Sequence, residues 1–141
     1  MKRVVIDTSV VVAALRSRLG VSNLLLRQVA DSQLSLLLSP ALFLEYEEVL
    51  KRPEHRLVHR LREEQVDEFL AEIAAIAVPV DLHYQWRPLA SDPSDEMVLE
   101  TAINGQADAL ITFNVQDFEA AKRFRISVLT PGQFLRRSHH E

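Results

Sequence analysis

Four acidic residues of this 141-residue chain stand where a folded sheet could bring them together. Asp7 comes directly after the apolar run Val4–Ile6, and Glu45, Asp95 and Asp117 each follow a later run of this kind. Short, largely apolar runs are typical of strands that are buried on both faces. Open α/β sheets bind ligands beyond the carboxyl ends of their strands, where gathered carboxylates repel one another unless cations lie between them. Oxygen ligands suit Mg²⁺ or Mn²⁺, so the pattern predicts a metal site.

Helical spacing predicts that Glu45 faces the packed side of its helix. It shares a stripe with three apolar or aromatic residues: Leu42, Tyr46 and Val49. The two glutamates that follow each have a basic residue four positions on, the favourable arrangement for surface pairs: Glu47 with Lys51 and Glu48 with Arg52. A partly buried carboxylate without a cation is costly, so Glu45 calls for a partner such as a metal. The alternative partner is an arginine from elsewhere in the chain, such as Arg16 or Arg27.

The same spacing singles out Asp95 at the start of the next acidic helix. Val98, Leu99 and Ala102 follow it at three, four and seven positions, so Asp95 is expected on the core-facing stripe. Glu96 and Glu100 are expected on the opposite, solvent-exposed face.

Helix capping is the simpler interpretation of each aspartate taken alone. Asp7, Asp95 and Asp117 all stand at predicted helix starts, where a carboxylate accepts backbone hydrogen bonds and favours the helix dipole. Capping does not predict, however, that all of them gather at the one edge where such folds bind ligands. The set therefore favours a site over separate caps.

Strands and helices alternate along the whole chain. The expected strands are Val4–Ile6, Leu34–Leu38, Val78–Val80, Ala109–Thr112 and Ile126–Leu129. The expected helices are Val10–Arg16, Ser22–Ala30, Ser39 to Lys51, Glu63–Ala77, Ser94 to Asn104 and Asp117–Phe124. We take Ser39 and Ser94 as N-caps, Gly105 as a C-terminal stop, and Thr130 with Gln133 as a capping box. This order predicts a single α/β domain over residues 1–141, a three-layer α/β/α sandwich with a central parallel sheet of four to five strands.

Composition limits the class of protein. The chain is 48% hydrophobic and 26% charged, as in soluble globular proteins, and it has no cysteine for a disulfide, thiolate metal site or thiol nucleophile. Its net charge of −4 argues against a protein that binds nucleic acid through its overall charge, although a local basic patch could still bind RNA. The N-terminal apolar run is too short for a signal peptide and no stretch approaches a membrane span, so the cytoplasm is the expected location.

Four segments in order resemble the PIN-domain ribonucleases, and most closely the toxins of type II toxin–antitoxin pairs. They are VVIDTS up to Ser9, SPALFLEY up to Tyr46, DPSDEMVLETA up to Ala102 and ALITFNVQDF up to Phe118. The resemblance spans essentially the whole chain and implies a PIN-like fold. It also implies that Asp7, Glu45 and Asp95 are the core catalytic and metal-binding acids, with Thr8 or Ser9 as a supporting hydroxyl and Thr112 supporting the fourth strand exit.

The chain departs from the family pattern at Asn114, where many members have a fourth aspartate. An asparagine still ligates through its carbonyl oxygen but brings no charge. Asp117, three residues on, could supply the missing catalytic carboxylate. The resemblance further implies one or two Mg²⁺ or Mn²⁺ ions, cleavage of single-stranded RNA, a homodimer, and an antitoxin protein that covers the acidic groove. A catalytically weakened domain that binds RNA or protein is the alternative suggested by Asn114.

Two further hypotheses concern a phosphatase and a metal-binding pair of histidines. A haloacid-dehalogenase-like phosphatase also begins with an aspartate after a buried strand and has a threonine like Thr112 after a later one, but Ser9 stands where its second aspartate belongs. The histidines four residues apart at 55 and 59 lack a third ligand nearby in sequence, so we expect them on a solvated face.

The densest basic stretch recurs at helical spacing through Arg52, Arg56 and Arg60, and it could contact the RNA backbone. An ordinary exposed face balanced by neighbouring glutamates explains it equally well.

Overall fold

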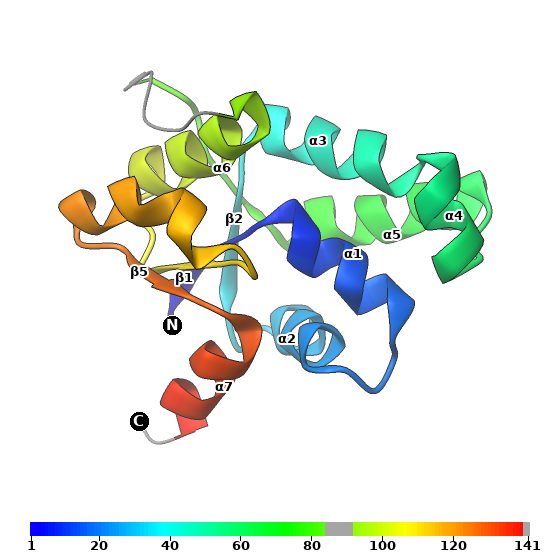
Figure 1. The fold of residues 1–141 in the computed structure, drawn as a ribbon, viewed down its shortest axis with the longest axis horizontal. Coiled ribbons are helices and arrows are strands. Elements are labelled where there is room, and N and C mark those ends of the chain that lie inside the picture. Colours follow the sequence, from blue (N-terminus) through cyan, green and yellow to red (C-terminus); the bar gives the residue numbers. More distant parts are fainter. Residues whose placement is uncertain (84–91, 140–141) are drawn as a thin grey trace.

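A five-stranded, wholly parallel sheet forms the centre of the protein in a computed structural model, which describes residues 1–83 and 92–139 (Figure 1). The strands are β1 (Arg3–Ile6), β2 (Ser35–Leu38), β3 (Val78–Pro79), β4 (Ala109–Ile111) and β5 (Ser127–Leu129). Their order across the sheet is β3-β2-β1-β4-β5. This confirms the predicted parallel sheet at the upper end of the expected strand number.

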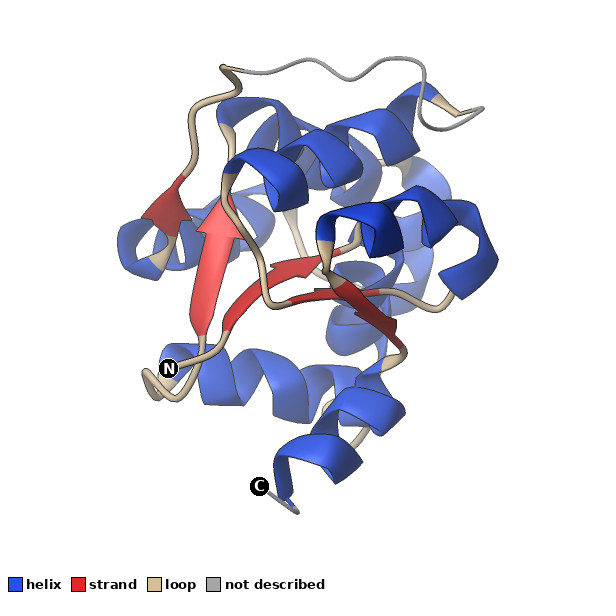
Figure 2. Cartoon of the chain, turned by 90° about the vertical axis from the view of Figure 1, so that its left-hand side faces the viewer, coloured by secondary structure: helices blue, strands red, loops and turns tan. Residues whose placement is uncertain are grey.

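Helices cover both faces of this sheet, as Figure 2 shows. They are α1 (Thr8–Arg16), α2 (Val21–Ala30), α3 (Pro40–Leu50), α4 (Pro53–His59), α5 (Glu63–Ile76), α6 (Pro93–Asn104), the 3₁₀ helix η1 (Val115–Phe124) and α7 (Pro131–His139). In Figure 1, α2 and α7 lie together on one side of the sheet and α6 packs beside η1 on the other. The predicted three-layer α/β/α architecture is therefore confirmed.

The central strand β1 explains why the sheet forms and where a ligand is expected. Val4, Val5 and Ile6 are completely buried, because β1 pairs with β2 on one side and β4 on the other. The chain leaves β1 towards β2 and later returns to β4, so the direction of the strand order reverses between β1 and β4. Open α/β sheets bind ligands at such a switch point, in the crevice outside the carboxyl ends of the strands.

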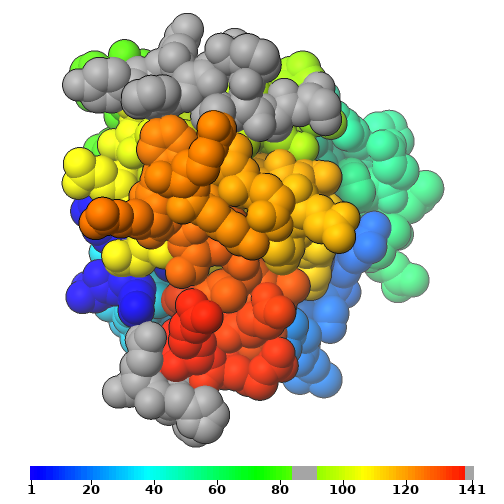
Figure 3. Space-filling view, turned by 60° about the vertical axis from the view of Figure 1, so that its left-hand side comes forward, coloured from blue at the N-terminus to red at the C-terminus, as the bar shows by residue number. Residues whose placement is uncertain are grey.

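The strand β5 lies at one edge of the sheet and is flanked by η1 and α7. Figure 3 shows these two helices, in orange and red, forming much of one face of the molecule. The Thr130–Gln133 capping box at the start of α7 is confirmed: Thr130 N–H donates to Gln133 Oε1 at 2.9 Å, and Gln133 N–H donates to Thr130 Oγ1 at 3.2 Å.

The expectation that Ser94 caps α6 needs correction, and two further details of the helix ends differ from a simple pattern. The N-cap of α6 is Asp92, whose carboxylate accepts from Ser94 N–H at 2.8 Å, so Ser94 is not the cap. Gly105 does end α6, but with a φ of −84° rather than a left-handed conformation. A side chain there would meet Leu37 Cδ1 at 2.9 Å, so close packing requires the glycine. The separate helix α4 was not predicted. Pro53 occupies its first position, where proline is favoured.

No single helix among the described residues has the length and apolar character to cross a membrane; α1 and α2 reach that length only as a pair bent by 102°.

Candidate active site

Asp7 is the acid of the predicted set that is held by side-chain hydrogen bonds from two hydroxyls. It follows β1 at the first position before α1 and is only 7% exposed. Its carboxylate makes no capping hydrogen bond to α1. Instead, Oδ2 accepts from the hydroxyl of Ser9 at 2.9 Å and from that of Thr112 at 2.7 Å. Ser9, rather than Thr8, therefore supplies the predicted supporting hydroxyl, and capping does not explain Asp7.

Burial controls the charge state of Asp7. Removal of water around the carboxylate raises its pKa above the usual value, the hydrogen bonds from Thr112 and Ser9 oppose that rise, and the charge of Asp117 adds to it. Burial therefore disfavours the charged carboxylate, while the two hydroxyl donors stabilise it and fix its orientation. A pKa shifted by burial in this way is typical of functional sites.

Glu45 and Tyr46 approach from α3. Glu45 is 8% exposed and lies on the same stripe as the buried Leu42, Tyr46 and Val49, as predicted. Within the described residues it forms no ion pair with Arg16, Arg27 or any other cation. Its burial without an ion-pair partner is the property that calls for a metal.

Tyr46 is a residue that sequence reasoning placed only in the core. Its hydroxyl donates to the carbonyl oxygen of Ile6, the residue before Asp7. Burial raises the pKa of Tyr46, and the negative charge of Asp7 raises it further. Tyr46 therefore joins α3 to the end of β1 and holds the backbone that carries Asp7. In the sequence, only the position of Tyr46 next to Glu45 pointed to this positioning role.

Asp95 lies in the first turn of α6, partly buried. Because Asp92 already caps the helix, Asp95 is not needed for that purpose. Burial, as the largest cause, and the charges of four neighbouring carboxylates together raise the pKa of Asp95 to about 6; these carboxylates are Asp7, Asp92, Asp117 and Glu45. Acids from the end of β1, from α3 and from η1 are thus close enough to Asp95 on α6 to disfavour its charge, as the sequence predicted for this edge.

Asn114 and Asp117 complete this end of the sheet. Both are exposed. Asn114 N–H donates to Thr112 Oγ1 at 2.9 Å, and Asp117 N–H donates to the carbonyl oxygen of Asn114 at 3.0 Å. Thr112 is buried and lies between Asp7 and this turn, as expected for a supporting residue. The 3₁₀ helix η1 begins at Val115, so Asp117 sits in its first turn.

The donor set fits a hard divalent cation in chemistry and charge: its side chains offer only oxygen ligands, and the cluster lacks positive charge. None of Asp7, Glu45, Asp95 and Asp117 forms an ion pair among the described residues. Over residues 1–83 and 92–139, however, no three His, Asp or Glu side chains converge tightly enough to hold an ion as they stand. A bound cation would have to draw these side chains together, against the repulsion that raises the pKa of Asp95.

Two other expectations for charged residues are wrong. Glu96 and Glu100 are buried rather than exposed to solvent. His59 is not simply solvated either: its Nδ1 accepts from Leu61 N–H and its Nε2 lies 2.9 Å from the carbonyl oxygen of Leu50. Both ring nitrogens are engaged by backbone, so His59 serves the α3–α4–α5 junction and is not placed to bind a metal.

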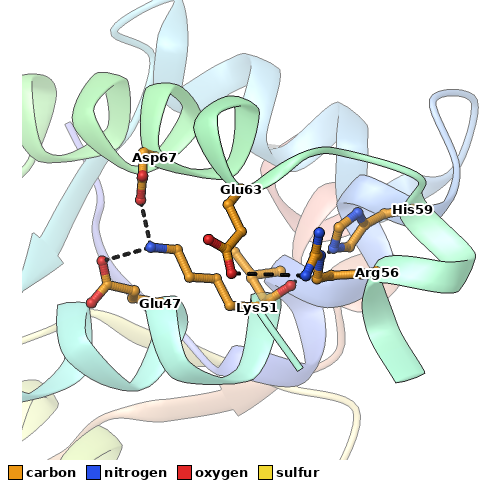
Figure 4. Close-up of polar contacts among 7 residues, drawn as sticks. Glu47, Lys51, Arg56, His59, Glu63 and Asp67 are labelled. Carbon is orange, nitrogen blue, oxygen red and sulfur yellow. Dashed lines mark hydrogen bonds and ion pairs between the residues drawn. The ribbon is translucent and has the colours of Figure 1, made fainter. Parts of the chain in front are cut away.

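The basic segment has acidic partners of its own, and Figure 4 shows those of Lys51 and Arg56. The guanidinium of Arg52 lies 2.9 Å from Glu48, and that of Arg56 lies 3.8 Å from Glu63. Arg60 ends α4 in a left-handed conformation, with φ of 61°. All three arginines remain exposed. The predicted surface pair of Lys51 with Glu47 is present at 3.4 Å, and Lys51 also reaches Asp67 of α5 at 2.7 Å.

The chain is similar to a known protein family. A family model described as PIN domain matches residues 3–116, which include all of the acids discussed above except Asp117. No curated protein matches the chain.

Proposed function

Since this chain belongs to the PIN domain family, whose members are generally nucleases, we propose that it is a metal-dependent endoribonuclease acting on single-stranded RNA. The observation that carries the proposal is the set of acids at the switch point of the sheet, where the charges of Asp7, Asp117 and Glu45 help to raise the pKa of Asp95. The family match supports a nuclease, and the oxygen-only donor set supports a divalent cation as its cofactor.

Asp7, Glu45 and Asp95 would hold Mg²⁺ or Mn²⁺, with Asp117 or the amide oxygen of Asn114 as a further ligand. When bound, the ion supplies activation of water and neutralisation of charge on the scissile phosphate. Ser9 and Thr112 keep the Asp7 carboxylate in one orientation through their hydrogen bonds to Oδ2. Tyr46 holds the preceding peptide through its bond to Ile6. These residues are positioning groups, because they act through Asp7.

The partner proposals rest on the family resemblance. The chain would act in the cytoplasm as a homodimer and as the toxin of a toxin–antitoxin pair. An antitoxin segment would inhibit it by covering the acidic crevice. An exposed basic residue on that segment would offset the charge of the carboxylates that are otherwise unpaired within the described chain.

Arg52, Arg56 and Arg60 are the proposed contacts for the RNA backbone. All are exposed, but RNA would have to compete with Glu48 for Arg52 and with Glu63 for Arg56. Charge reversal of Arg56 and Arg60 together should weaken RNA binding and lower its salt dependence. Unchanged affinity in that double variant would remove these residues from the proposal.

Cleavage of a mixed single-stranded RNA pool tests the proposed activity. The purified protein is incubated with Mg²⁺ or Mn²⁺, with EDTA, and as an Asp7→Asn variant. Asp31→Asn serves as a matched control, because Asp31 is an exposed aspartate at the C-terminal end of α2. We expect cutting by the wild type and by Asp31→Asn, and none after Asp7→Asn or EDTA.

A small phosphoester assayed in parallel separates the other readings. Hydrolysis of the phosphoester without RNA cleavage would favour a phosphatase. RNA binding without cleavage of either substrate would favour the weakened binding module, with Asn114 as the first position to restore to aspartate.

A further inference from the structure

Phe113 is an aromatic side chain exposed at the acidic edge. It is 47% exposed. Every other aromatic residue among those the structure describes is buried or partly buried: Phe43, Tyr46, Phe69, Phe118, Phe124 and Phe134. Among the described residues, the one exposed aromatic thus lies two positions after the end of β4, at the strand exit that contributes to the acidic cluster.

The backbone on both sides of Phe113 is held in place. On one side, Thr112 N–H donates to the carbonyl oxygen of Leu129 at 2.9 Å, and its hydroxyl donates to Asp7 at 2.7 Å. On the other side, Asn114 N–H donates to Thr112 Oγ1 at 2.9 Å. The ring is therefore carried by an ordered turn rather than a free loop. A ligand that contacts it would pay little entropy for ordering that turn.

RNA needs a source of affinity at this place that does not depend on basic residues. The neighbouring acids repel a polyanion in the absence of cations, and the chain carries a net charge of −4. Stacking of a base on an aromatic ring supplies affinity without charge, and every nucleobase offers a π-face. An exposed ring one residue from Thr112 therefore has the chemistry to hold the base while the phosphate lies towards the acids.

We propose that Phe113 is a stacking platform for a nucleobase of single-stranded RNA next to the acidic crevice. This inference rests on the proposed ribonuclease function and adds a specific base-binding residue to it. Because purines present the larger π-surface, the subsite should prefer a purine over a pyrimidine.

Binding without turnover tests the platform. Labelled oligoadenylate is titrated with protein in Ca²⁺, and a single abasic position is moved along the strand. For the wild type, one abasic position should weaken binding about tenfold. Phe113→Ala should weaken binding of the intact strand by a similar factor and should no longer respond to that abasic position. Phe113→Trp should restore both the affinity and the response, whereas Phe113→Leu should not.

Ile76→Ala is the matched control, since Ile76 is 45% exposed but precedes β3 at the opposite, amino-terminal edge of the sheet. It should bind like the wild type. If Phe113→Ala keeps wild-type affinity and still responds to the abasic position, the platform is excluded while the nuclease proposal stands. If the wild type binds no single-stranded RNA, both proposals fail. Loss of binding in Phe113→Trp as well would assign the residue a structural role and overturn the platform.

Discussion

The hydroxyl of Thr112 lies 2.7 Å from Asp7 Oδ2, and this hydrogen bond joins residues 105 positions apart in the chain. It crosses the switch point between β1 and β4, where the two strands pair in register from Val4 with Ala109 to Ile6 with Ile111. The same oxygen of Thr112 accepts from Asn114 N–H. The buried hydroxyl of Thr112 thus orients Asp7, the first acid of the cluster, and the turn that leads to Asp117, the last.

Replacing Thr112 by valine should remove this link while keeping the side-chain shape. The hydrogen bond lowers the pKa of Asp7, so its loss should raise that pKa further and destabilise the protein by about 1–2 kcal/mol. Nuclease activity should fall about tenfold, because Asp7 loses its fixed orientation. Denaturant unfolding and RNA cleavage measure the two effects. Thr112→Ser should recover most of both, and a valine variant as active as the wild type would show that the hydroxyl positions nothing.

The raised pKa of Asp95 predicts a pH-dependent stability of the metal-free protein. The pKa is about 6 in the folded protein against 3.8 ordinarily, so the folded state binds this proton more tightly than the unfolded state. The resulting stabilisation is present below about pH 4 and is lost as pH rises through about 6. Asp95→Asn should therefore raise the melting temperature at pH 7 more than at pH 4.

Thermal unfolding in EDTA at both pH values checks this prediction for Asp95. The control Asp31→Asn should show no such difference, since Asp31 is exposed and is not among the carboxylates that raise the pKa of Asp95. Mg²⁺ should stabilise the wild type more than Asp95→Asn, because binding to the folded state alone raises stability. Equal melting temperatures for the wild type and Asp95→Asn at pH 7 would contradict the repulsion.

Gly105 tests the packing at the C-terminal end of α6. A Cβ atom there would lie 2.9 Å from Leu37 Cδ1 and 2.9 Å from the carbonyl oxygen of Thr101, so Gly105→Ala should cost about 1–3 kcal/mol of stability. Gly132→Ala in α7 is the control, because its Cβ would meet only Arg136 Nη1, at 3.4 Å. That change should leave stability unchanged or raise it by about 0.5–1 kcal/mol. Equal unfolding midpoints for the two variants would refute the close approach.

The architecture could be predicted because buried strands and amphipathic helices leave periodic patterns in the sequence. The burial of Glu45 followed from its stripe with Leu42 and Val49, and the exposed position of Glu48 beside Arg52 followed from the same helix. The strand exits then predicted which acids share an edge. Local pattern was sufficient wherever a helix has one buried face.

Local pattern failed where tertiary contacts decide the outcome. Glu96 and Glu100 were expected in solvent, but α6 packs against η1, α3 and the sheet, so more than one of its faces is buried. The bond from Tyr46 to Ile6 joins residues 40 positions apart, and that from Thr112 to Asp7 joins residues still more distant. Contacts between residues so far apart in the chain leave no periodic signal in a single sequence.

The most direct test of the acidic cluster as the catalytic metal site compares two glutamates of one helix. Glu45 is buried at the crevice, whereas Glu48, three residues on, is exposed and paired with Arg52. Cleavage of single-stranded RNA is measured in Mn²⁺ for Glu45→Gln and Glu48→Gln. The account predicts that Glu45→Gln loses cleavage while Glu48→Gln cuts like the wild type. Equal cleavage by the two variants would contradict it.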